Sequence, residues 1–281
     1  MRWRGREGSS NIEDRRRMGG RAAPVGGLAL VVILLIGMFL GVDTSQLLEG
    51  MDGGGQAAGD RPLSAEDEAA AEFVSVALKD TETVWTDIFR DELGRTYRPA
   101  TLVLFSGATN SACGGATAQT GPFYCPVDGK VYLDTEFFAT LSRQLGAGGD
   151  FAAAYVVAHE IAHHVQDELG ILGEVNAVRA RVSEAESNAL SVRVELQADC
   201  LSGVWARHAA ERLGTLEEGD IAEAMNAASR IGDDTLQRNA GQRPMPDSFT
   251  HGTSEQRQRW FAQGYKAGSI SACDTFNARN L

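Results

Sequence analysis

Residues 151–169, FAAAYVVAHEIAHHVQDEL, decide the fold of this chain and hold its chemistry. The stretch lies between Asp150 and Gly170, and its apolar residues recur at the spacing of an amphipathic helix. At about 100° per residue, His159 and His163 are only about 40° apart around the helix axis. Both imidazoles therefore point the same way, on a face separate from the apolar one.

The two histidines belong to an HExxH motif, which is typical of zinc-dependent hydrolases. A chance occurrence in a chain of this length is on the order of one in a hundred. Glu160 lies about 100° from His159, where its carboxylate can act as general base on a zinc-activated water without binding the metal. His164, at about 140°, is predicted to be a hydrogen-bonded histidine at the helix edge and not a ligand.

A catalytic zinc site needs a third protein ligand and an open position. The metzincin continuation is absent, because Gln166 and Leu169 stand where that motif needs Gly and His. The segment ELQAD, residues 195–199, lies in a second predicted helix with an apolar opposite face. We expect Glu195 to be the third ligand, and Asp199 to orient one of the ligand histidines by a hydrogen bond.

The N-terminal part of the chain indicates a membrane anchor. Residues 25–42 carry no charge, follow a cluster of Arg and precede acidic residues. This pattern predicts a basic cytoplasmic segment at 1–22, a transmembrane helix at 23–42, a flexible linker at 43–63 and a peptidase domain at 64–281 outside the cytoplasmic membrane. A cleaved signal peptide is the alternative, but no A-x-A-like site follows.

The four cysteines all follow residue 42 and include no C-x-x-C spacing, so disulfides are expected in preference to a cysteine metal site. Three pairings are possible. Cys113 and Cys125 bracket a short Gly-rich stretch, which favours a Cys113–Cys125 bond and leaves Cys200 to pair with Cys273.

The chain has 281 residues, 43% of them hydrophobic, enough for a substantial core. Its formal charge of −12 argues against a nucleic-acid partner, because binding phosphates requires a concentrated basic surface. The expected partners are therefore a peptide or protein substrate and, through residues 23–42, a membrane.

The pattern of the remaining residues predicts an α+β fold, mainly helical, with a small sheet or hairpin. Ser64 and Asp67 form a capping box that opens a helix to about Leu93. Strands are expected at 101–105, 121–125 and 131–134, the last two joined by a turn at Asp128-Gly129, with helices from Thr135 almost to the end. The helix caps are expected at Thr135, Asp150, Asp220 and Ser254, and the stops at Gly146, Gly170, Gly214 and Gly232.

Several segments together resemble the bacterial membrane-anchored neutral zinc metallopeptidases. They are MRWRGR at the start, SSNIEDRRR (9–17), GPFYCP (121–126), VYLD (131–134), AYVVAHEIAHHVQ (154–166), ELQADC (195–200), IGDD (231–234) and FTHGTSEQR (249–257). The resemblance covers nearly the whole chain. It implies a zincin fold of the gluzincin type, with one zinc ion on His159, His163 and Glu195 and with Glu160 as catalytic base.

The expected activity is hydrolysis of peptide bonds by a zinc-activated water, with Glu160 as general base. Such sites usually add a donor for the oxyanion, and His251 is the first candidate and Tyr155 the second. The hairpin at 121–134 offers an edge strand on which an extended peptide could align.

Two alternatives stay open from the sequence. A non-catalytic envelope scaffold could use the same ligands for a structural metal, although structural zinc sites normally have four protein ligands and Glu160 would then have no task. A metal-dependent amidase acting on cell-wall peptides would use the same chemistry on another bond.

Overall fold

The computed structural model describes residues 1–17, 63–117 and 120–281. The expected transmembrane helix at 23–42 and nearly all of the expected linker lie outside these residues. Among the helices that the structure describes, none is both long and apolar enough to cross a membrane.

A four-stranded sheet has the order β1-β2-β6-β5. Its strands are β1 (Ile12–Asp14), β2 (Thr101–Phe105), β6 (Lys130–Asp134) and β5 (Phe123–Cys125). The first three run parallel, whereas β5 pairs antiparallel with β6 and forms one edge. The β5–β6 hairpin turns at the expected place, where Gly129 adopts a φ of 68°. A separate hairpin, β3 (Ala108–Ser111) with β4 (Gly114–Thr117), was not expected.

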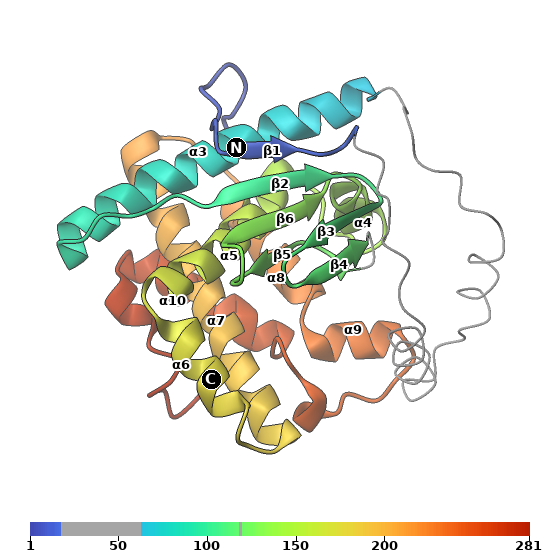
Figure 1. The fold of residues 1–281 in the computed structure, drawn as a ribbon, viewed down its shortest axis with the longest axis vertical. Coiled ribbons are helices and arrows are strands. Elements are labelled where there is room, and N and C mark those ends of the chain that lie inside the picture. The colour runs from blue at the N-terminus through green and yellow to red at the C-terminus, as the bar shows by residue number, and fades with distance from the viewer. Residues whose placement is uncertain (18–62, 118–119) are drawn as a thin grey trace.

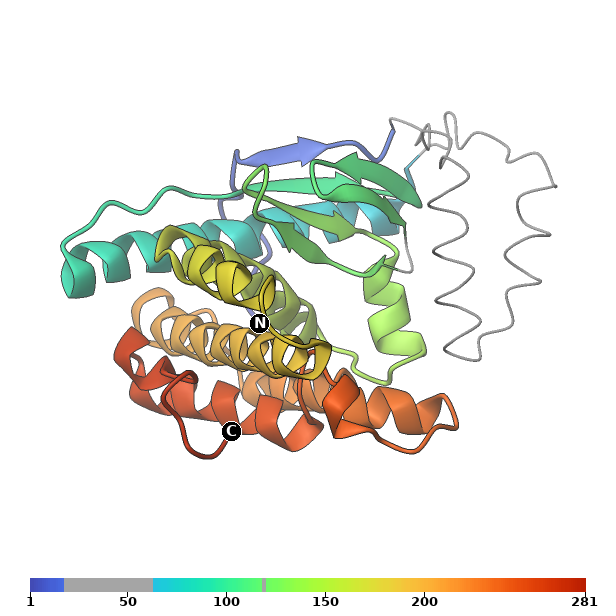
Figure 2. The same ribbon diagram turned by 60° about the horizontal axis from the view of Figure 1, so that its bottom comes forward.

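Helices make up most of the described chain. They are α3 (Ala65–Leu93), α4 (Phe137–Arg143), α5 (Asp150–Glu168), α6 (Ile171–Arg179), α7 (Glu184–His208), α8 (Asp220–Arg230), α9 (Asp233–Asn239) and α10 (Ser254–Ala267), with short turns η2 (Ala209–Leu213), η3 (Pro246–Ser248) and η4 (Ile270–Cys273). Figures 1 and 2 show the sheet and α3 on one side of the molecule and α7, α8 and α10 on the other, with α5 between them. The expected α+β architecture is confirmed.

Helix α3 begins at the predicted capping box, in which the Ser64 hydroxyl accepts the Asp67 backbone N–H and the Asp67 carboxylate accepts the Ser64 N–H. Its apolar residues are buried together, including Phe73, Trp85 and Phe89. Because this face lies against α5 and α7, α3 supports the helices that carry the site.

Two glycines let α7 and α10 approach backbone to backbone. A Cβ on Gly264 would lie 1.8 Å from the carbonyl oxygen of Cys200, and one on Gly203 would lie 2.1 Å from that of Phe261. No larger residue fits at either position without moving a helix. This contact brings the start of α10, with Arg257, onto the face of α7 that carries Asp199.

The expected helix starts are displaced by one residue. The caps observed are Glu136, Gly149, Gly219 and Thr253, in place of Thr135, Asp150, Asp220 and Ser254. The carboxylates of Asp150 and Asp220 have other partners, which explains two of these differences: Asp150 accepts the Trp3 indole N–H, and Asp220 accepts the backbone N–H of Glu217.

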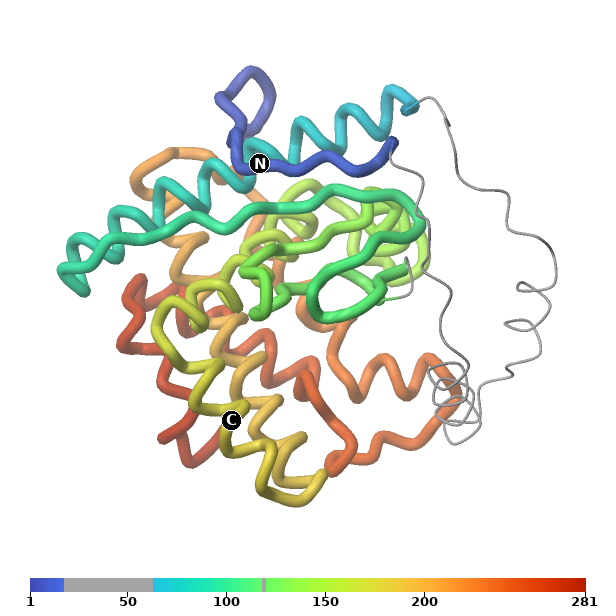
Figure 3. The backbone as a smooth tube through the Cα atoms, viewed as in Figure 1, coloured from blue at the N-terminus to red at the C-terminus, as the bar shows by residue number. Residues whose placement is uncertain are grey.

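Residues 1–17 belong to the same folded unit as the rest, in contrast to the separate basic segment expected at 1–22. Figure 3 traces this segment beside α3. Strand β1 pairs with β2, and Trp3 is buried against Phe73. Arg6 binds both carboxylate oxygens of the buried Asp80, at 2.5 and 2.7 Å. Arg6 and Arg16 of this segment thus form ion pairs with acidic residues of α3.

Candidate metal centre and catalytic residues

Helix α5 is buried over most of its length, and its two motif histidines lie on the face turned toward α7. Helix α7 starts at a capping box of Ser183 and Glu186 and carries Glu195 opposite this face. The Nε2 atom of His159 is 3.0 Å from Glu195 Oε2, and that of His163 is 3.5 Å from Oε1.

The three predicted ligands therefore converge. One donor atom from each of His159, His163 and Glu195 lies within 4.8 Å of the other two. Two imidazole nitrogens and one carboxylate form a ligand set that suits zinc and leaves a fourth position for water or substrate. The chemistry of these donors thus fits the cofactor that the sequence predicts.

Asp199 holds the first histidine. Its Oδ1 atom is 2.9 Å from His159 Nδ1, so the ring donates its Nδ1 proton to the carboxylate and presents Nε2 to the ligand cluster. Arg257 and the Tyr155 hydroxyl also donate to Asp199. Burial alone would raise the pKa of Asp199, but the charges of Arg257 and His159 outweigh it and lower this pKa to about 2.

Gln166 holds the second histidine. Its side-chain oxygen is 2.8 Å from His163 Nδ1, and Gln166 is completely buried. Both histidine rings are thus fixed from behind, one by a carboxylate and the other by an amide.

Glu160 lies beside the ligand cluster, buried and lining the same cavity as the two histidines. Within the described residues its carboxylate has no hydrogen-bond partner. Burial raises its pKa, although His159 and His163 oppose the shift. A carboxyl group with a raised pKa and no fixed partner suits a group that takes up and returns a proton.

His251 lines this cavity from the loop before α10. Its Nδ1 atom is 3.2 Å from Asp233 Oδ1, and its backbone N–H also donates to Asp233. Burial disfavours the charged ring, but Asp233 and Glu195 outweigh this effect and raise the pKa of His251. The raised pKa favours the protonated ring, and a protonated ring could donate a hydrogen bond to an oxyanion in the cavity.

Tyr155 has a different environment from the one expected. Its ring is fully buried, and its hydroxyl donates to Asp199. This hydrogen bond gives Tyr155 a place in the support of His159, in contrast to the second-choice oxyanion donor that the sequence suggested. His164 bonds the carbonyl of Arg98 and the hydroxyl of Tyr124, away from the ligand cluster.

The cavity beside the cluster has a volume of about 530 Å³. Phe123 and Tyr124 of the edge strand β5 line one side, and apolar residues such as Phe137, Leu172 and Ile231 line others. A space of this size accepts several residues of a peptide chain in contact with β5.

The structure brings together residues that sequence reasoning assigned to no role. Arg257 contacts Asp199 from α10, Gln166 contacts His163 from the same helix, α5, and Asp233 contacts His251 from α9. Arg257 and Asp233 lie in the segments FTHGTSEQR and IGDD, so membership of those segments was the only available signal. Both expected disulfides, Cys113–Cys125 and Cys200–Cys273, are present.

Comparison with known proteins gives one family model and several relatives. The family model described as "Putative neutral zinc metallopeptidase" matches residues 1–276. The chain is 46% identical to "Uncharacterized protein YpfJ" of Escherichia coli K12 over 98% of this chain and 99% of that protein. It is also 46% identical to "Uncharacterized protein Rv2575" of Mycobacterium tuberculosis H37Rv, over 63% of this chain and 62% of that protein. No solved structure matches it significantly.

Proposed function

Since the chain belongs to the neutral zinc metallopeptidase family, we propose that it hydrolyses peptide bonds with one zinc ion held by His159, His163 and Glu195. The observation that carries the proposal is the convergence of these ligands beside Glu160 in one cavity. His251 lines the same cavity, and Asp233 and Glu195 raise its pKa. A purely structural metal site would need neither group there.

Each group at the site has one role in the proposed reaction. Zinc, when bound, supplies a Lewis acid that activates water and polarises the peptide carbonyl. Glu160 accepts the proton of the attacking water and delivers it to the leaving amine. His251 in its protonated form donates to the oxyanion that develops on the carbonyl, and Asp233 orients the ring and raises its pKa. The outer edge of β5, the last strand of the described sheet, aligns the extended substrate.

The proposed place of action is outside the cytoplasm. Two disulfides support it, because such bonds persist in oxidising compartments. Strand β1 pairs with β2, so residues 1–17 would lie on the same side of a membrane as the cavity, in contrast to the cytoplasmic position that the Arg cluster suggested. Anchoring through residues 23–42 stays a prediction of the sequence.

The test is zinc content and peptidase activity of the full chain, compared with Glu160→Gln. We expect one zinc per chain in both, and cleavage of a denatured protein substrate only by the wild type. Glu174→Gln, an exposed change on α6, is the matched control and should cleave normally. Zinc without cleavage in the wild type would favour the scaffold or a restricted substrate such as a cell-wall peptide, and absence of zinc would refute the metal site.

A further inference from the structure

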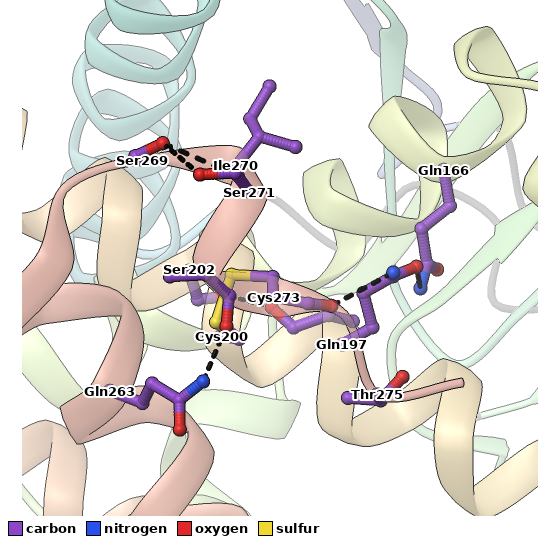
Figure 4. The surroundings of a disulfide bond; sticks show 12 residues. Gln166, Gln197, Cys200, Ser202, Gln263, Ser269, Ile270, Ser271, Cys273 and Thr275 are labelled. Atoms are coloured by element: carbon purple, nitrogen blue, oxygen red, sulfur yellow. Dashed lines mark hydrogen bonds between the residues drawn. A yellow bond between two sulfur atoms is a disulfide. The ribbon is translucent and has the colours of Figure 1, made fainter. Parts of the chain in front are cut away.

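A chain of two buried amides joins His163 to a disulfide bond. The side-chain nitrogen of Gln166 donates to the side-chain oxygen of Gln197 at 3.0 Å. The side-chain nitrogen of Gln197 donates to the backbone carbonyl of Cys273, also at 3.0 Å. Figure 4 shows Gln166 and Gln197 in line with Cys273, which is bonded to Cys200. We call Gln166 and Gln197 the amide relay.

Backbone carbonyls determine the direction of the amide relay. The carbonyl of Cys273 can only accept, so Gln197 has to present its NH₂ group there and its oxygen to Gln166. Gln166 in turn uses its NH₂ group on Gln197 and on the carbonyl of Val194, 2.8 Å away. Its oxygen is then left for His163. Neither amide can be turned around without setting two acceptors against each other.

This direction has a consequence for the metal ligand. An amide oxygen facing Nδ1 of His163 requires Nδ1 to carry the proton. The neutral ring then has its lone pair on Nε2, the nitrogen that faces Glu195. The amide relay therefore selects the ring form that can bind a metal.

The disulfide holds the far end of the amide relay. Cys200 and Gln197 lie one turn apart on α7, and Cys273 ends the short turn η4 near the C-terminus. Both cysteines are buried, and their bond ties η4 to α7. The Cys273 carbonyl is thereby held at Gln197, although the two residues are 76 positions apart in the chain.

We propose that Gln166 and Gln197 are positioning residues for His163 and that the Cys200–Cys273 disulfide is the fixed end of their relay, so that zinc affinity depends on this disulfide. The proposal rests on the proposed zinc function of the site. It implies that the metal centre reaches full affinity only after the disulfide has formed. The second disulfide, Cys113–Cys125, has no part in this relay.

The experiment measures the zinc affinity of the full chain by competition with a chelator. The test variants are Gln166→Leu, Gln197→Leu, their double variant, and Cys200→Ser combined with Cys273→Ser. The matched controls are Gln258→Leu, which removes a single side-chain bond to the carbonyl of Met225, and Cys113→Ser combined with Cys125→Ser. Leu78→Ala, a core change in α3 and outside the relay, controls for lost stability.

We expect zinc affinity to fall about tenfold to a hundredfold in each test variant. The double glutamine variant should bind zinc no more weakly than either single variant, because the loss of one glutamine already interrupts the relay. The visible absorption of Co²⁺ bound at the site should change in the same variants. Affinity and Co²⁺ spectrum should stay at the wild-type values in the three controls, measured at a temperature where circular dichroism shows each protein folded.

Wild-type zinc affinity in Gln166→Leu and Gln197→Leu would overturn the proposal, as would an equal loss in Leu78→Ala. These results leave the proposed function intact as long as the wild type binds zinc and cleaves peptides. A wild type that binds no zinc would refute both.

Discussion

Arg257 binds the carboxylate of Asp199 through two N–H groups, with Nε 2.8 Å from Oδ2 and Nη2 3.0 Å from Oδ1. Both side chains are buried, with 3% and 0% of their surface exposed. The same carboxylate accepts the Nδ1 proton of His159. An ion pair inside the protein thus orients a histidine that lines the cavity.

Removal of Arg257 should destabilise the protein strongly. Arg257→Met leaves a buried charge on Asp199 without its partner, and we expect the free energy of unfolding to fall by about 3–5 kcal/mol. Urea unfolding of the full chain measures this change in the free energy of unfolding. Arg207→Met removes the exposed pair with Glu211 and should cost no more than about 1 kcal/mol. Equal losses in the two variants would contradict the account of the buried pair.

The fall of kcat/KM at alkaline pH should reflect the deprotonation of His251. As a donor it has to be protonated, so kcat/KM should fall as pH rises through its raised pKa. Asp233→Asn removes a charge that favours the protonated ring, which lowers the pKa of His251 and moves this fall to lower pH. Asp247→Asn, on the exposed turn η3, is the control. An alkaline limb at the same pH in Asp233→Asn would exclude His251 as the titrating donor.

The two disulfides should differ in their effect on stability. The Cys200–Cys273 bond closes 73 residues and the Cys113–Cys125 bond only 12. The loss of chain entropy in the unfolded state predicts stabilisation of about 4 kcal/mol for the longer loop and about 3 kcal/mol for the shorter one. Denaturant unfolding of the two double serine variants compares these values, and a larger loss from the shorter loop would contradict the entropic explanation.

Residues 1–17 should remain packed against the rest of the fold in cells. A Cβ on Gly8 would lie 3.1 Å from the Cβ of Ser75, slightly closer than in a relaxed disulfide. Gly8→Cys with Ser75→Cys should therefore form an intramolecular cross-link in cells, seen as a shift on a non-reducing gel. Gly5→Cys with Ser75→Cys should not, because no atom lies within 4 Å of a Cβ at Gly5. Absence of the cross-link in Gly8→Cys with Ser75→Cys would show that residues 1–17 do not pack against α3 in cells.

Much of the site could be predicted because it depends on spacing within one helix. His159 and His163 face the same way in any α-helix, and so do Glu195 and Asp199. The capping box at Ser64 and the hairpin turn at Gly129 are equally local, and the structure contains both. Strand β1 was missed because its three residues, Ile-Glu-Asp, show no hydrophobic alternation and become a strand only by pairing with β2.

The sequence by itself determined which residues can bind a metal and transfer a proton, since periodicity places them on common helix faces. Only the tertiary structure decided what holds them. Arg257 reaches Asp199 across 58 positions, and Gln197 meets Cys273 across 76. Such contacts depend on how the helices pack, here on the close approach of α7 and α10 at Gly203 and Gly264. The short-range pattern of a sequence does not show which residues meet across such long separations in the chain.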